Sequence, residues 1–251
     1  MPPPLPILMY HKIDGDILRK HLDWLRGKFL PVHLYEIKEY FIQPTWKIYH
    51  ELYHSKDLLP KIVLTFDDAL LDFYISSYSI LKDEYDFKAT ICVPTGFISN
   101  PGNPRKLDNW ENNEHSTNLI MTWSEIRDIS KAKNELGEPL IEILPHSINH
   151  VPFDSYGEDI KEVQRQIQES KKTLVLNLSI PEPIFFCLPG GAGWKFDEHE
   201  GINHALDKAN YIGALRAEYS NEWNRYCIPR YSISSSTCIS TLLMGYQRNE
   251  V

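Results

Sequence analysis

The chain has 251 residues, 42% hydrophobic and 24% charged, with 12 glycines and 17 prolines; this composition excludes a collagen-like, low-complexity or wholly disordered chain. Its formal net charge is −8 and it has no run of lysines and arginines. Both features argue against a nucleic-acid or anionic-membrane partner. The four cysteines form no CxxC pair, so neither a disulfide framework nor a cysteine zinc site is expected.

Apolar, strand-like runs alternate with helical patterns along the chain. Strands are predicted at residues 6–10, 61–65, 89–93, 140–144, 184–188, 211–215 and 229–233. Helices are predicted at residues 16–29, 35–41, 73–85, 123–132, 157–176 and 199–209. Thr122 and Glu125 have the spacing of a capping box that opens one of these helices. Such alternation predicts an α/β fold, either a parallel sheet or a β/α barrel, in one domain over residues 1–251.

Two segments fall outside this alternation. The N-terminal sequence MPPPLPILMYHKI lacks a basic region, and prolines interrupt its apolar run, so it does not resemble a secretory signal. Because no stretch approaches the ~18 apolar residues of a membrane span, we expect a cytoplasmic chain without a transmembrane segment. Residues 95–120 are long, polar and rich in Gly, Pro and Asn, which predicts either a functional lid or a surface insertion.

Polar or glycine-rich residues follow four of the predicted strands, where barrel enzymes place their chemistry. Asp67 and Asp68 follow the strand at 61–65, and His11 follows the first strand. His146 and His150 come after the strand at 140–144, and the sequence PGGAG comes after the strand at 184–188. Taken singly, an Asp pair is usually a turn or a cap and a Gly pair usually turns the chain. Their occurrence together at strand ends indicates a site.

These residue types suit one reaction in particular. Two imidazoles and one carboxylate make a three-ligand metal site with an open position for water, and water bound to such an ion ionises near neutral pH. A second carboxylate can take the proton of that water, and a further histidine can protonate a leaving amine. Backbone N–H groups of a glycine-rich loop can stabilise an oxyanion. Together the parts would hydrolyse an amide.

Several of these segments resemble a known family. Residues 65–69 (TFDDA) resemble the TFDDG motif of the polysaccharide deacetylases, the NodB-homology group of carbohydrate esterase family 4, and residues 146–150 (HSINH) resemble their H[ST]xxH motif. Residues 186–191 (FCLPGG) resemble their third motif. Residues 7–13 (ILMYHKI) are similar to the start of the branch that includes poly-N-acetylglucosamine deacetylases. The resemblance implies a single distorted (β/α)₇ barrel that removes acetyl groups from N-acetylated sugars with a metal ion.

The resemblance also assigns roles to individual residues. It implies metal binding by Asp68, His146 and His150, a general base at Asp67, and an oxyanion hole formed by the N–H of Gly190. In the branch with the YH start the acid histidine lies at the N-terminus, which makes His11 the candidate general acid. We expect one divalent ion, zinc first, although cobalt, nickel, manganese or iron would suit the same ligands. The expected partner is an acetylated amino sugar, glycan or sugar nucleotide.

The chain departs from the family pattern at three positions. Ala69 replaces the usual glycine, Gly190 replaces a common aromatic residue, and Cys187 stands where many members have an arginine that holds the base. Arg230, in the last predicted strand, is the candidate replacement for that arginine. These departures leave open a catalytically impaired, carbohydrate-binding relative of the same fold. A third alternative is a non-haem iron oxygenase, since two histidines and one carboxylate are also its ligand set.

Overall fold

The computed structural model describes residues 5–53, 59–100, 102, 119–157, 159–190 and 200–246. Every strand ladder within these residues is parallel. The strands are β1 (Ile7–Tyr10), β2 (Leu30–Pro31), β3 (Lys61–Phe66), β4 (Ala89–Val93), β5 (Ile141–Pro145), β6 (Phe185–Cys187), β7 (Gly213–Leu215) and β8 (Tyr231–Ser232). The expected α/β fold with a parallel sheet is therefore confirmed.

The main sheet has the order β5-β4-β3-β1-β8, with β2 beside β3, and β6 pairs with β7 in a second sheet. A parallel bridge between Leu215 and Ile228 carries the chain from β7 towards β8. No ladder joins β5 to β6 among the described residues, but β5 contacts β6, and the His146 ring hydrogen-bonds to the Cys187 carbonyl. Among the described residues the two parallel sheets thus lie side by side without ladders that close them into a barrel, an arrangement compatible with the distorted (β/α)₇ barrel expected from the sequence.

Side chains along the strands alternate between two apolar layers, as the period of a β-strand requires. The inner layer of the barrel includes Ile7, Val63, Cys92, Leu144 and Cys187. The residues next to them in sequence, among them Leu8, Leu64, Ile91 and Ile143, pack outward against helices. Since both faces are buried, the strands read as continuous apolar runs. The same alternation directs Asp67, at the end of β3, into the barrel.

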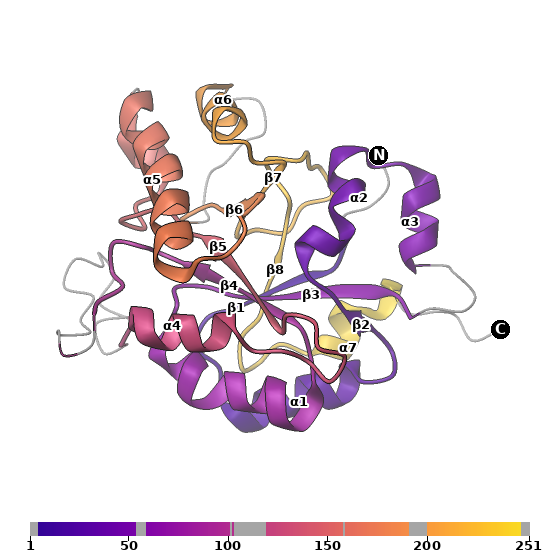
Figure 1. Ribbon diagram of the computed structural model, residues 1–251. Coiled ribbons are helices and arrows are strands. Elements are labelled where there is room, and N and C mark those ends of the chain that lie inside the picture. The colour runs from indigo at the N-terminus through magenta and orange to yellow at the C-terminus, as the bar shows by residue number, and fades with distance from the viewer. Residues whose placement is uncertain are drawn as a thin grey trace.

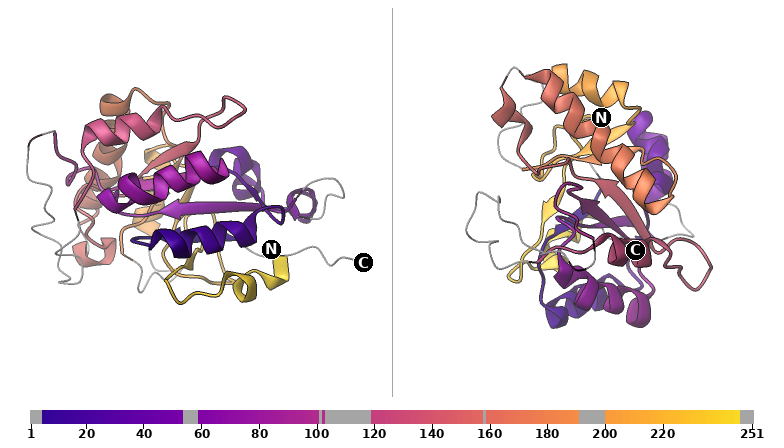
Figure 2. Two further views of the ribbon diagram at one scale, coloured as in Figure 1. Left: turned by 90° about the horizontal axis from the view of Figure 1, so that it is seen from below. Right: turned by 60° about the vertical axis from the view of Figure 1, so that its left-hand side comes forward.

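Helices surround the strands, with α1 and α4 below them and α5 and α6 above them in the view of Figure 1, and the views in Figure 2 agree. The α-helices are α1 (Gly15–Leu25), α2 (Lys38–Ile42), α3 (Trp46–Tyr53), α4 (Trp123–Ser130), α5 (Ile160–Leu178), α6 (Glu200–Lys208) and α7 (Ile239–Leu242). Shorter 3₁₀ turns are η1 (Leu34–Ile37), η5 (Phe153–Tyr156) and η6 (Met244–Tyr246). Among the described residues, no helix is long and apolar enough to cross a membrane.

Some helical predictions needed correction. The helix predicted at 73–85 is present, wound mainly as two π-helical segments, η2 (Phe73–Ser77) and η3 (Ile80–Tyr85), a variant that apolar periodicity does not distinguish. The short helices α3 and α7 were not predicted. The capping box of α4 is present, since Thr122 and Glu125 each accept a hydrogen bond from the other's backbone N–H.

The predicted lid at residues 95–120 falls mostly outside the described residues, so it stays a prediction. Its N-terminal end contacts the segment that carries the two site histidines. The N–H groups of Thr95 and Gly96 donate hydrogen bonds to the carbonyls of Ser147 and Ile148. A Cβ atom on Gly96 would lie 2.7 Å from the Ile148 oxygen, so this close approach requires glycine.

Candidate metal centre and active site

The carboxyl ends of β3 and β5 bring three side chains of the sequence-predicted site together. One ligand atom each from Asp68, His146 and His150 lies within 4.8 Å of the other two. Asp68 Oδ1 is 3.3 Å from His150 Nε2 and 3.6 Å from His146 Nε2. The two imidazole Nε2 atoms are 2.9 Å apart. Three donor atoms therefore face one small volume, although they come from segments far apart in the sequence.

Left-handed backbone conformations produce this convergence. Asp68 has φ of 74° and Ala69 has φ of 51°, directly after β3. Because of this kink, Asp68 does not continue the alternation of the strand, and its carboxylate faces the histidines while that of Asp67 enters the barrel. Ala69 thus occupies a conformation that favours glycine, at a cost of about 1–2 kcal/mol. In the histidine segment, Ser147 and His150 also have positive φ.

The donor set fits a divalent cation. His146 Nδ1 donates a hydrogen bond to the Cys187 carbonyl oxygen at 2.9 Å, which fixes the tautomer and leaves Nε2 as a free ligand atom. Burial opposes a charge on this ring, but the negative charge of the Cys187 thiolate and of the carboxylates of Asp67 and Asp68 outweighs it and raises the pKa of His146 to about 9. The surroundings of His146 thus favour positive charge, as expected where a cation would bind.

Asp67 lies beside this centre and is held by Arg230. The Arg230 guanidinium donates to both carboxylate oxygens of Asp67, at 2.7 and 2.8 Å, and also to the Thr65 hydroxyl and the Arg216 carbonyl. Arg230 is fully buried and Asp67 is 4% exposed. Burial alone would raise the pKa of Asp67, but the Arg230 charge, with smaller effects from His146 and His11, holds it well below its usual range. Asp67 is consequently an ionised, immobilised carboxylate.

Two buried cysteines adjoin Asp67, a feature that the sequence reasoning missed. Sulfur atoms of Cys92 and Cys187 lie within 4.8 Å of an Asp67 oxygen and of each other, and Cys187 Sγ is 3.8 Å from Asp67 Oδ1. This second group is a poor cation site, because the Arg230 guanidinium engages both oxygens of Asp67 and adds positive charge. Both cysteines occupy inward positions of their strands, β4 and β6, but the relative depth of the two strands is not visible in the sequence.

His11 approaches the centre from the opposite side of Asp68. Its Nε2 lies 3.8 Å from Asp68 Oδ2, whereas the other two histidines approach Oδ1. The His11 side chain is 36% exposed, compared with 2% for His146. The ring therefore borders both the Asp68 centre and solvent, on the side from which a substrate could approach.

Gly190 follows β6 and packs on the segment after His150. It has φ of 69°, and a Cβ atom there would lie 2.6 Å from Cγ of Pro152. Both its conformation and its neighbour thus require glycine, which explains why the aromatic residue common in related motifs is absent here. The rest of the glycine-rich loop, residues 191–193, lies outside the described residues.

A comparison with protein families matches residues 54–211, more than half of the chain, to the family described as "Polysaccharide deacetylase". This match includes the two aspartates, both site histidines and Gly190, but not His11 or Arg230. A search of curated protein sequences gives no match.

Solved structures of similar fold cover nearly the whole chain. One is the deacetylase PplD from Streptococcus pyogenes in complex with acetate, 19% identical with a TM-score of 0.71, covering 98% of this chain and 100% of that one. Another is a de-N-acetylase from Aggregatibacter actinomycetemcomitans, 18% identical with a TM-score of 0.68, covering 95% and 98%. A third is IcaB from Ammonifex degensii, 16% identical with a TM-score of 0.67, covering 92% of each chain. At these identities the likeness establishes the shared fold.

Proposed function

The chain belongs to the polysaccharide deacetylase family, and from this we propose that it is a metal-dependent hydrolase that removes an N-acetyl or related acyl group from an amino sugar or glycan. One observation carries the proposal. The Asp68–His146–His150 group, suited to a cation, lies beside a carboxylate, Asp67, that a buried arginine keeps ionised. A metal-dependent hydrolytic site of this kind combines both parts, a place for a divalent ion and a separate base.

Asp68, His146 and His150 would hold one divalent ion, for which zinc is the first candidate and cobalt, nickel, manganese and iron are alternatives. When bound, such an ion supplies Lewis-acid chemistry, since it acidifies water and polarises a carbonyl. Asp67 accepts the proton of the attacking water, and Arg230 keeps its carboxylate in place. The Gly190 N–H donates to the oxygen of the former carbonyl, and His11 delivers a proton to the departing amine.

The family description supports a polysaccharide substrate, and the names of two structures with this fold support removal of an acetyl group. One is called a de-N-acetylase, and another is a deacetylase with bound acetate. With water as the second reactant, the reaction would convert an N-acetylated sugar into an amino sugar and acetate. A glycan, a small amino sugar or a sugar nucleotide would each present the required amide.

The alternative is a carbohydrate-binding relative that has lost activity, suggested by Ala69 and Cys187. Both departures are accommodated in the fold. Ala69 adopts a left-handed conformation, φ of 51°, and Arg230 provides the guanidinium for Asp67 that position 187 lacks. These contacts support an active hydrolase over the impaired relative.

The experiment combines metal analysis with acetate release from N-acetylglucosamine oligomers. We expect about one equivalent of divalent metal, loss of turnover after chelation, and its return when zinc or cobalt is added. His146→Ala should lose both metal and turnover. The matched control is His204→Ala, since His204 is exposed on α6, and it should keep both. Full turnover in the chelated protein, or stoichiometric tight metal binding in His146→Ala, would contradict the proposal.

A further inference from the structure

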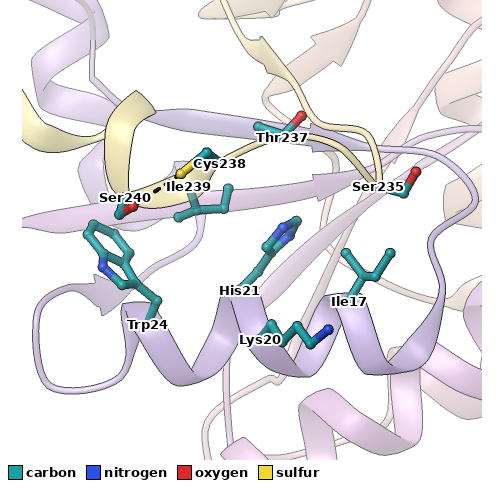
Figure 3. A pocket seen from close by; sticks show the side chains of 9 residues that line it. All are labelled: Ile17, Lys20, His21, Trp24, Ser235, Thr237, Cys238, Ile239 and Ser240. Carbon is teal, nitrogen blue, oxygen red and sulfur yellow. Dashed lines mark hydrogen bonds between the residues drawn. The ribbon is translucent and has the colours of Figure 1, made fainter.

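A second concave site lies on the outside of the barrel, between α1 and residues 235–240. It has a volume of about 340 Å³, at the small end of the range for small-molecule sites. Figure 3 shows Trp24 and Ser240 at one end and Ile17 and Ser235 at the other. Ile17, His21 and Trp24 share one face of α1, so the pocket extends about 10 Å along the helix.

The lining of this pocket combines hydroxyl groups with an aromatic platform. Ser235 and Ser240 contribute hydroxyls and Trp24 contributes a flat ring, whereas the Thr237 hydroxyl is engaged by the N–H and hydroxyl of Ser234. His21 is 6% exposed, burial lowers its pKa, and its Nδ1 faces the Tyr10 hydroxyl at 3.5 Å, so it forms an uncharged part of the pocket wall. The described lining residues include no carboxylate, and Lys20 is the lysine among them. This chemistry disfavours a cationic ligand and matches a neutral one that has hydroxyls and an apolar face.

The pocket begins close to the catalytic rim. The N–H of Ile233, two residues before Ser235, donates to the carbonyl of Met9 in β1, and β1 leads directly to His11. On the other side, α1 starts at Gly15, four residues after His11. The Tyr10 hydroxyl also lies 3.5 Å from His21 Nδ1. A polymer bound at the metal centre would therefore have the open end of the pocket within its path.

We propose that this pocket between α1 and residues 235–240 is a second sugar-binding site, which holds another unit of the glycan whose acyl group is cleaved at the Asp68 centre. The proposal rests on the proposed function for the identity of the ligand. Trp24 would stack on the apolar face of the sugar ring, as an aromatic side chain with a large flat surface can. The hydroxyls of Ser235 and Ser240 would exchange hydrogen bonds with the ring hydroxyls.

A cysteine in the pocket offers a direct binding assay that does not depend on turnover. Cys238 is exposed, whereas Cys92, Cys187 and Cys227 are buried. Hydrogen bonds from the Ser240 and Thr241 hydroxyls lower the pKa of Cys238 to about 7, so its thiolate reacts readily with a disulfide reagent such as DTNB. We expect the N-acetylglucosamine tetramer to slow this reaction in a saturable manner.

Variants distinguish protection of Cys238 by binding in the pocket from a general effect of the sugar on the DTNB reaction. Trp24→Ala should abolish the protection, and Ser235→Leu should do the same by narrowing the pocket from the loop side without altering α1. Trp46→Ala is the matched control, because Trp46 is 57% exposed and does not line the pocket, and it should keep the protection. A reaction rate that stays unchanged up to the solubility limit of the tetramer in the unmodified chain would overturn the proposal.

Kinetics give a second, independent measurement. Trp24→Ala should raise KM for the tetramer about tenfold, the size expected for loss of one buried aromatic anchor, and leave kcat/KM for a small aryl acetate unchanged. An unchanged KM for the tetramer would overturn the sugar site while leaving the hydrolase assignment intact. Protection of Cys238 in a chain that releases no acetate from any substrate would support the sugar site and overturn the hydrolase.

Discussion

Arg230 donates two hydrogen bonds to Asp67, although 163 residues separate them in the chain. The pair is almost completely buried, and a buried ion pair is stable only while both partners are present. Asp67 and Arg230 are therefore coupled both in stability and in the proposed chemistry, and the two effects can be measured separately.

Arg230→Gln should destabilise the protein by about 3–5 kcal/mol, because it leaves a buried carboxylate without its cation. It should also lower kcat, since the base loses the group that orients it. Urea unfolding and acetate release measure the two effects. An unfolding free energy equal to that of the unmodified protein would contradict the coupling.

Adding Asp67→Asn to Arg230→Gln removes both charges, and the double variant should recover most of the lost stability while remaining inactive. A double variant less stable than Arg230→Gln alone would show that the arginine acts through its other contacts, with Thr65 and Arg216.

Asp67→Asn and Asp68→Asn should have different effects despite their adjacency. The Asp67 variant should keep its metal and lose at least ~10²-fold in kcat, the usual contribution of a general base. Asp68→Asn should instead weaken metal binding, because the lost oxygen faces the two imidazoles. Metal content and kcat, measured on the same preparations, test this. Equal metal loss in both variants would refute the division of roles.

His11→Ala should retain metal and lose at least ~10²-fold in kcat on amide substrates, since a departing amine needs a proton. The loss should be smaller on an aryl acetate, whose leaving group departs without one. His33→Ala removes another histidine, one that is fully buried and hydrogen-bonds to the Leu140 carbonyl at 3.1 Å, and should affect both substrates equally. Equal losses in His11→Ala would assign that ring a packing role.

Gly190→Ala should lower the free energy of unfolding by more than the strain of a left-handed backbone conformation alone. Gly137 has φ of 79°, and a Cβ atom added there would meet no other atom within 4 Å, so Gly137→Ala should lose about 1–2 kcal/mol from backbone strain only. Gly190→Ala also forces a methyl group against Pro152, and it should be less stable and lower kcat by displacing the backbone N–H. Thermal unfolding of both variants, with kcat for the second, measures the difference.

The sequence predicted the barrel strands and the strand-end positions of the site residues well, because buried parallel strands have long apolar runs and the polar residues after them stand out. It could not predict the approach of Cys92 and Cys187 to Asp67, since each cysteine looks like an ordinary core residue in its own strand. That contact depends on the relative depth of two strands, which only the folded register fixes.

Short elements could not be predicted from the sequence either. Helix α7 has four residues, too few for an apolar period to be recognised. The pocket between α1 and residues 235–240 depends on that segment and on pairing of β8 with β1, so no local pattern indicates it. The positive φ of Asp68 was likewise invisible, because it arises from the turn that brings distant segments together.

The pairing of β1 with both β3 and β8 has a consequence for biosynthesis. A ribosome releases His11 early and Arg230 near the end, so the first strand must wait for the last before the barrel wall is complete. Until residue 230 emerges, a nascent chain already holds Asp67 without the guanidinium that neutralises its burial. Contacts this distant in sequence slow folding, and translation arrested before residue 230 would yield a chain that has Asp68, His146 and His150 but lacks the partner of Asp67.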